Sequence, residues 1–463
     1  MTDISGSGLR MRNSPTESRS LLRSRFSPGC HDKEQLAATS GDAGPTFPHG
    51  WKLAPMMLGF ILSFVKYALQ RKKYPYFKLK SLRIIYARKL VAIRRYVKLG
   101  RHYYGTTMRI PRWPSRAFDL MVANGGLNIE PELIKDKHQI DSVIIAITRK
   151  CTYDCEHCYA YTDRSDEDVV PVDRWIEVVR QIQDVGASVI VLSGGEPMVR
   201  FGDMLEILRS ADKSLSDFHL HTSGKGMSLQ RARDLKDAGL VAAGIGLDYP
   251  DAERHDRFRG QPGAFRDATN ALEDLRRAGI FTYTNVCLQK DLLNNGALRD
   301  YLDLARRLRV GTIQLLEPKP SGRYEMQEPD HLFSDEDRRI VMEFFAEVNQ
   351  SDKYKDYPPV AYTAYYERPE NFGCLMGGLS HLSIDGSGNV NPCAFVPVSF
   401  GNILNEDFSV IYKRMRATIS QPIRRDCASL LLRQTIARRR SESRGAAVPY
   451  NTIRQEWDRI FSA

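Results

Sequence analysis

The feature that most constrains the fold is an alternation of short β-rich runs with amphipathic helical stretches, which begins after Ile140. Val172 to Asp184 and Phe265 to Ala278 are two of the expected helices, because their apolar residues recur at helical spacing. Six such βα repeats imply a parallel sheet, curved or closed, with the chemistry at the carboxyl ends of its strands. The expected strands are residues 143–148, 188–193, 217–222, 241–248, 281–289 and 311–317.

Length and composition agree with a folded protein of this kind. The 463 residues allow one large domain with appendages, or two to three ordinary domains. With 42% hydrophobic and 27% charged residues, the chain is neither wholly disordered nor a polytopic membrane protein. Eight cysteines are too few for a disulfide scaffold. Cysteines that cluster are therefore interpreted as metal or redox ligands, and we expect a cytoplasmic protein.

The positive net charge of +11 belongs to one part of the chain. Residues 43–118 contain seventeen Lys and Arg and no Asp or Glu, which leaves a net charge of −6 for all other residues. Residues 1–48 are rich in Ser, Gly, Arg and Pro and are predicted to be a disordered arm. Residues 49–139 are predicted to form a basic amphipathic helical extension, and residues 436–463 a basic tail.

Two segments of the basic extension indicate what kind of surface it contacts. The uncharged run Leu53 to Val65 is shorter than the roughly 20 residues of a spanning helix, so we expect it to lie in a membrane interface or to pack on the core. No signal peptide is predicted. On a helical wheel, residues 81–100 separate a basic face from an aromatic and aliphatic face. Such a helix suits an anionic membrane surface, at the inner face of the membrane, and equally suits packing on the protein with a solvated basic face. Nucleic acid is less favoured, because the apolar face needs a partner too.

Three cysteines follow the first expected strand at once. Cys151, Cys155 and Cys158 lie within eight residues, and three thiolates on one loop can ligate three irons of a [4Fe-4S] cluster and leave the fourth iron open. Zinc is the alternative, but structural zinc usually takes four ligands in paired short spacings, and His157 cannot easily supply the fourth. The spacing therefore favours the cluster.

The second expected strand ends in a glycine pair followed by an acid, Gly194-Gly195-Glu196-Pro197. Two glycines let the backbone approach a ligand closely, and a carboxylate beside them can hold an ammonium group. The segment lies one βα unit after the cysteines, so we expect both to meet at the same rim of the sheet.

The CxxxCxxC loop and the Gly-Gly-Glu-Pro segment together resemble the radical S-adenosylmethionine (radical SAM) superfamily, over roughly residues 140–427. The resemblance implies an α/β fold with a partial (β/α)6 TIM-like barrel at residues 140–330 and a [4Fe-4S] cluster that binds SAM. It implies that Cys151, Cys155 and Cys158 ligate the cluster and that Gly194, Gly195 and Glu196 cradle the methionine amino group.

Three further positions support the resemblance, although the sequence around two of them departs from the family's pattern. Ser223 lies in Thr-Ser-Gly, which resembles the family's Thr-Asn-Gly. Asp248 ends Gly246-Leu-Asp where many relatives have Ser-Leu-Asp, so a Ser hydroxyl near SAM is missing. Arg259 belongs to a His-Asp-x-x-Arg-Gly sequence that resembles the peptide-modifying branch, where it either meets the SAM carboxylate or is structural.

The resemblance also implies the chemistry. The reduced cluster passes one electron to SAM, and the resulting 5′-deoxyadenosyl radical removes a hydrogen atom from a substrate. A reduced flavodoxin or ferredoxin-type protein is the implied electron donor. No general acid or base is obligatory, so no catalytic side chain is assigned.

A second metal site is predicted at residues 331–435, after an expected helix from Ser334 to Val348. An Asp-Gly-Ser-Gly hairpin turn brings Cys374 and Cys393 toward each other. Their spacing, Cx13Gx4C, resembles the opening of the SPASM or twitch auxiliary-cluster domain of radical SAM enzymes, and Cys427 follows downstream. Three ligands would hold an auxiliary [4Fe-4S] cluster with an open iron, or a non-cysteine side chain completes it. Alternatively, Cys427 is incidental.

The last predictions concern the two remaining cysteines and the substrate. We expect Cys287 to be a small core residue and Cys30 a free surface thiol. The leading prediction is a radical SAM oxidoreductase that acts on a peptide or protein side chain. The alternatives are a radical SAM enzyme for a lipid or other membrane-borne small molecule, and a non-catalytic metal-binding scaffold.

Overall fold

Six strands of one large parallel sheet correspond to the six that the alternation predicts, with ends that differ by no more than two residues. Most of their residues are buried and apolar side chains predominate, as expected for strands covered on both faces. These strands are β3 (Ser142–Ala146), β4 (Val189–Ser193), β5 (Asp217–Thr222), β6 (Leu240–Gly246), β7 (Phe281–Cys287) and β8 (Thr312–Leu316). The computed structural model describes residues 44–80, 95–128, 132–294, 296–325, 329–443 and 447–461. The predicted arm up to residue 43, with Cys30, lies outside them.

Three strands from the C-terminal part of the chain extend this sheet at both edges. β9 (Val360–Tyr362) lies parallel to β8, and β10 (His381–Ile384) lies parallel to β3. β11 (Val390–Asn391) pairs antiparallel with β10, which confirms the predicted hairpin turn between them. The strand order is β11-β10-β3-β4-β5-β6-β7-β8-β9, and no pairing among the described residues joins β9 to β11. The fold is therefore the predicted α/β partial barrel, open in its hydrogen bonding.

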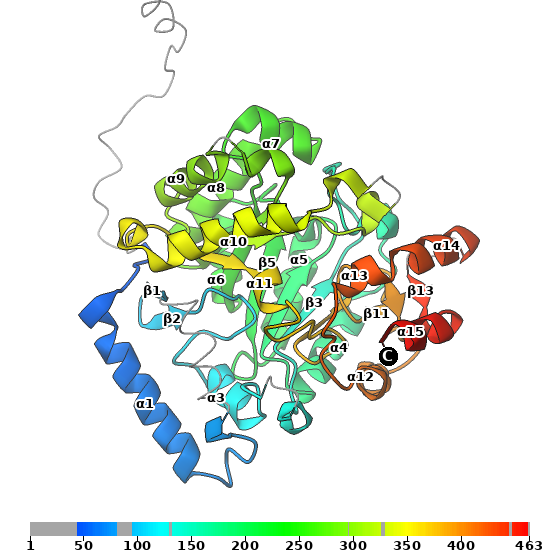
Figure 1. Cartoon of the computed structure of the whole chain (residues 1–463), viewed down its shortest axis with the longest axis horizontal. Coiled ribbons are helices and arrows are strands. Elements are labelled where there is room, and N and C mark those ends of the chain that lie inside the picture. Colours follow the sequence, from blue (N-terminus) through cyan, green and yellow to red (C-terminus); the bar gives the residue numbers. More distant parts are fainter. Residues whose placement is uncertain are drawn as a thin grey trace, which may run out of the picture. The chain divides into compact units, whose positions relative to one another are not determined.

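Amphipathic helices cover the sheet (Figure 1). α4 buries Trp175, Val178 and Ile182 at helical spacing against the core, and α10 begins with a capping box between Ser334 and Asp337. The expected helices at residues 172–184, 265–278 and 334–348 are confirmed within two residues. The helices after the core strands are α4 (Val172–Asp184), α5 (Phe201–Ser210), α6 (Leu229–Asp237), α7 (Ala252–Arg259), α8 (Ala264–Arg277), α9 (Ala297–Arg307) and α10 (Asp335–Gln350).

The last part of the chain adds several short helices and one further pair of short strands (Figure 1). A short parallel pair, β12 with β13, joins residues about fifty positions apart. The elements are α11 (Thr363–Tyr366), β12 (Val398–Ser399), α12 (Phe408–Thr418), α13 (Ala428–Leu431), α14 (Arg433–Ser443), β13 (Val448–Pro449) and α15 (Arg454–Phe461).

The basic extension packs against the amino ends of the sheet strands, opposite the cysteine loop. It comprises α1 (Ala54–Leu69), the antiparallel hairpin of β1 (Val97–Leu99) and β2 (His102–Tyr104), and α3 (Arg116–Ala123). Tyr104 stacks on Phe281, the first residue of β7, with ring centroids 4.0 Å apart. The Arg112 amide donates to Asp217, the first residue of β5, over 2.9 Å.

One prediction for this extension is wrong in the part that the structure describes. Residues 97–99, the end of the expected amphipathic helix at 81–100, form a strand, because the β1–β2 hairpin packs its apolar side chains on the sheet. Arg95, expected on a solvated basic face, is buried and donates to the Val348 and Lys355 carbonyls. Residues 81–94 lie outside the described residues.

Candidate active site

The loop that carries Cys151, Cys155 and Cys158 follows β3 and is held from both sides. On one side, the amides of Gly195 and Glu196 donate to the carbonyls of Thr148 and Lys150, over 2.8 and 2.7 Å. On the other side, the Asp154 and Glu156 amides donate to the carbonyls of Arg259 and Phe258, at the end of α7. The loop is therefore positioned by backbone contacts, and its three thiols are left for a ligand.

The donor set fits an iron-sulfur cluster. Burial, reinforced by the neighbouring Cys155 and Cys151, raises the pKa of Cys158 to about 12, so the thiolates need a cationic partner to form. Among the described residues, no three His, Cys, Asp or Glu side chains lie close enough to hold one metal ion. A cubane spaces its thiolates more widely, because each one binds a different iron. Three thiols on one loop therefore offer one ligand to each of three irons.

The glycine pair is required by how closely the cysteine loop approaches it. A Cβ atom on Gly195 would lie 2.1 Å from the Lys150 carbonyl oxygen, and one on Gly194 would lie 2.6 Å from the Thr148 carbonyl oxygen. No side chain fits at either position without moving backbone.

Glu196 is buried and its carboxylate is fully used within the protein. One oxygen accepts from the Met198 amide and the Thr222 hydroxyl, and the other from the amide and the hydroxyl of Ser223. Two acceptor sites per oxygen are thereby filled. An ammonium group that binds here has to displace a hydroxyl, which makes Ser223 and Thr222 part of the same site.

Asp248 and Arg259 form a buried ion pair beside the cluster loop. Arg259 Nε donates to Asp248 Oδ2 over 2.6 Å, and the Cys287 amide donates to Oδ1 over 2.9 Å. Burial opposes ionisation of Arg259, but the charges of Asp248 and Cys155 outweigh it and raise its pKa. A Cβ atom on Gly246 would lie 2.2 Å from the Arg259 guanidinium. The resemblance implies a Ser at position 246. The Arg259 guanidinium fills the space that the side chain of such a Ser would take.

The three auxiliary cysteines come from separate segments and meet the same cavity. Cys374 pairs through its backbone with Ile423, Cys393 follows β11, and Cys427 precedes α13. Burial and the nearby Glu367 and Cys427 raise the pKa of Cys374. Glu367, which pairs with Arg109 over 3.0 Å, is thus a carboxylate close to the Cys374 and Cys393 thiols.

One cavity of about 310 Å³ unites both cysteine groups. All twelve site residues that the sequence predicts line it, although their individual roles stay predictions. They are Cys151, Cys155, Cys158, Gly194, Gly195, Glu196, Ser223, Asp248, Arg259, Cys374, Cys393 and Cys427.

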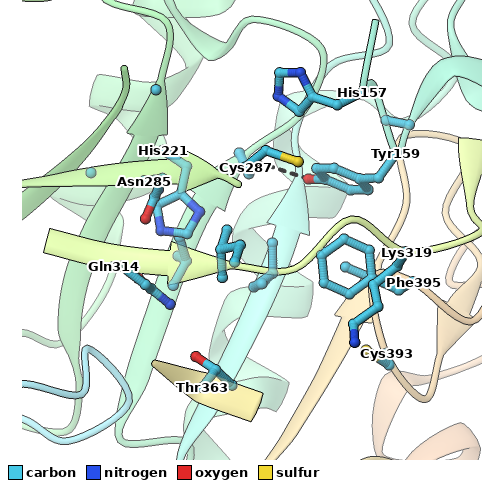
Figure 2. Close-up of a pocket in the computed structure, with 18 of the residues that line it drawn as sticks. His157, Tyr159, His221, Asn285, Cys287, Gln314, Lys319, Thr363, Cys393 and Phe395 are labelled. Carbon is cyan, nitrogen blue, oxygen red and sulfur yellow. Dashed lines mark hydrogen bonds between the residues drawn. The ribbon is translucent and has the colours of Figure 1, made fainter. Parts of the chain in front are cut away.

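Side chains that sequence reasoning missed line the space between the two groups. Figure 2 shows His221 of β5, Asn285 of β7 and Gln314 of β8 on one side, with Lys319 and Phe395 on the other. Asn285 and Gln314 lie side by side in register on β7 and β8. The side-chain oxygen of each is buried without a hydrogen-bond partner. The available signal was polar residues at alternate positions of otherwise apolar strands.

Two other residues, Cys287 and Lys319, also line this space. Cys287 packs against the core, as predicted, but it is only partly buried and also lines the cavity. Lys319 bonds to Glu317 over 2.9 Å, and the nearby Cys427 and Glu317 outweigh burial and raise its pKa.

Comparisons with known proteins show what the chain is similar to. Residues 145–294 match the family model of the Radical SAM superfamily. The chain is 28% identical over 293 residues to an AdoMet-dependent heme synthase of Nitratidesulfovibrio vulgaris, covering 58% of this chain and 77% of that protein. It is 27% identical over 290 residues to a PqqA peptide cyclase of Rhizobium meliloti, covering 60% and 74%. The structure of Streptococcus suis SuiB bound to precursor peptide SuiA aligns with a TM-score of 0.49 and 16% identity, over 60% of this chain and 65% of that one.

Proposed function

We propose that this chain, whose residues 145–294 match the Radical SAM superfamily, is a radical SAM enzyme that abstracts a hydrogen atom from a peptide or protein side chain. The family implies a [4Fe-4S] cluster and SAM, for which Cys151, Cys155 and Cys158 are the ligands that the loop offers. When bound, the cluster and SAM supply a 5′-deoxyadenosyl radical. We extend the proposal to an auxiliary cluster on Cys374, Cys393 and Cys427.

The protein's own residues position the reactants and keep water out. Glu196, Ser223 and Thr222 offer an acidic and hydroxyl-bearing pocket for the amino group of SAM, and Arg259 offers a cation for its carboxylate. Buried aliphatic and aromatic groups form much of the cavity wall, which limits the access of water.

The unpaired amides of Asn285 and Gln314 are the observation that carries the peptide proposal. Each primary amide presents both a donor and an acceptor, and a peptide group presents the complementary pair. Two of them side by side on β7 and β8 suit a backbone segment bearing the reactive side chain. The cavity lies at the small end of the range for ligand sites, and part of it is taken by the nucleotide, so the remaining space suits a side chain.

The test of this proposal has two stages. Anaerobically reconstituted protein with SAM and dithionite should release 5′-deoxyadenosine, whereas absence of that product despite full cluster absorbance would favour the scaffold alternative. A panel of peptides with perdeuterated side chains is then supplied. Deuterium in the deoxyadenosine identifies the residue attacked, and that transfer should fall at least tenfold in Asn285→Ala and Gln314→Ala while uncoupled cleavage of SAM persists.

A lipid or other membrane-borne molecule is the second candidate substrate. The exposed apolar side chains of α1, among them Leu58 at 58% and Leu62 at 60% exposure, favour it. Deuterium transfer from a perdeuterated lipid, with none from peptides, would select this candidate.

A further inference from the structure

Helix α1 presents a second apolar face to solvent. In the described part of the chain, eight of the thirteen exposed large hydrophobic side chains lie between Trp51 and Leu79. Single exposed hydrophobic residues are ordinary, but a contiguous set marks an interaction surface. We call the seven of them on α1 and on the short turn before it the outer face; it consists of Trp51, Met57, Leu58, Ile61, Leu62, Val65 and Leu69.

The opposite face of α1 is fixed to the protein along its length. Phe60 stacks on Trp113 with ring centroids 4.4 Å apart, and a Cβ atom on Gly59 would lie 2.3 Å from the same indole. Nearly two helical turns further, Lys66 and Tyr67 both bond to Asp119, over 2.9 and 2.5 Å. The helix therefore lies flat on the body with its outer face turned away (Figure 1).

The charge around the outer face decides what covers it. Lys52 precedes the helix, Arg71, Lys72 and Lys73 follow it, and all four side chains are exposed. No acidic residue occurs in residues 43–118. A second copy of the chain docked by the same face would bring these cations together, which is unfavourable. An anionic bilayer offers both the apolar layer and the opposite charge.

The contacts between α1 and the rest of the protein also decide how the helix meets that bilayer. Trp51–Leu69 is the one helix in the described residues that is long and apolar enough to cross a membrane, and 11% of it is buried. At 1.5 Å per residue it spans about 28 Å, close to the thickness of a hydrocarbon core. Crossing would break the Phe60 and Tyr67 contacts and draw Lys66 away from Asp119 into lipid. We propose that α1 docks in the plane of an anionic lipid surface through its outer face, beyond and independent of the radical chemistry.

Vesicle flotation of the full-length protein tests the proposal. We expect binding to phosphatidylcholine vesicles that contain phosphatidylglycerol, little binding to pure phosphatidylcholine, and release in high salt. Leu58→Glu with Leu62→Glu should abolish binding. The matched control, Leu404→Glu with Val410→Glu, also replaces two exposed apolar residues and should bind like wild type. Neutralising Arg71, Lys72 and Lys73 with Gln should lower the partition coefficient on the order of a hundredfold.

Several results would overturn the proposal. Equal binding by the outer-face variant and the control would show that α1 is not the contact. Wild-type protein that resists both high salt and alkaline carbonate would indicate a spanning helix. A wild-type dimer that the outer-face variant dissociates, without vesicle binding, would assign the face to a second copy. Iron content and 5′-deoxyadenosine release should match wild type in every variant, so failure here is distinguishable from failure of the proposed function.

Discussion

Removing the negative charge of Asp248 should destabilise the protein more than any exposed ion pair does. The Asp248 side chain is fully buried and that of Arg259 is 11% exposed, with 2.6 Å between Oδ2 and Nε. Asp248→Asn keeps the shape but leaves the guanidinium buried without its counter-ion, for which losses of about 3–5 kcal/mol are typical. The change is therefore expected to lower the free energy of unfolding by about that amount.

A control on the same helix sharpens this prediction. Glu253 and Arg257 form an exposed i, i+4 pair on α7, so Glu253→Gln should cost no more than about 0.5 kcal/mol. Urea unfolding of the cluster-free proteins, followed by circular dichroism, measures both. The double variant Asp248→Asn with Arg259→Gln should recover part of the loss, because no unpaired charge remains buried. A loss below 1 kcal/mol for Asp248→Asn, or equal effects at both sites, would refute the reasoning.

Three further perturbations have defined outcomes. Cys155→Ala should abolish SAM cleavage, whereas Cys393→Ala should spare uncoupled cleavage and stop product formation; identical behaviour in a deoxyadenosine assay would contradict two separate clusters. On reconstitution, the Gly195→Ala variant should take up far less iron than the wild-type protein, because the added Cβ would meet the Lys150 carbonyl oxygen at 2.1 Å. An iron content equal to that of the wild-type protein would count against this. Burial, followed by a neighbouring carboxylate, raises the pKa of Asp385 to about 7. The folded state then binds its proton more tightly than the unfolded state does, so stability should fall as pH rises from about 4 to 7, and Asp385→Asn should flatten that slope in thermal melts.

The sequence predicted what depends on local pattern. The six core strands and α4, α8 and α10 follow from periodicity, because burial of a repeating face is a local requirement. The glycine pair was also predictable, since a close approach of backbone leaves few other residues possible at Gly194 and Gly195.

Features that depend on distant partners were not predictable in the same way. Residues 97–99 became a strand because their partners lie in β2 and on the sheet, and no local pattern records them. The guanidinium that fills the space over Gly246 comes from Arg259, and periodicity does not show which way that side chain turns. The unpaired amide of Asn285 became visible only once β8 lay beside β7.

The pairing of β10 with β3 has a consequence for synthesis of the chain on the ribosome. β3 is made early, yet its outer neighbour is His381–Ile384, more than 200 residues later. Until then β3 is an uncovered edge, and uncovered edges recruit other chains. Nascent or truncated forms that stop before residue 381 should therefore depend on chaperones, and the cluster loop beside β3 should mature only after translation is nearly complete.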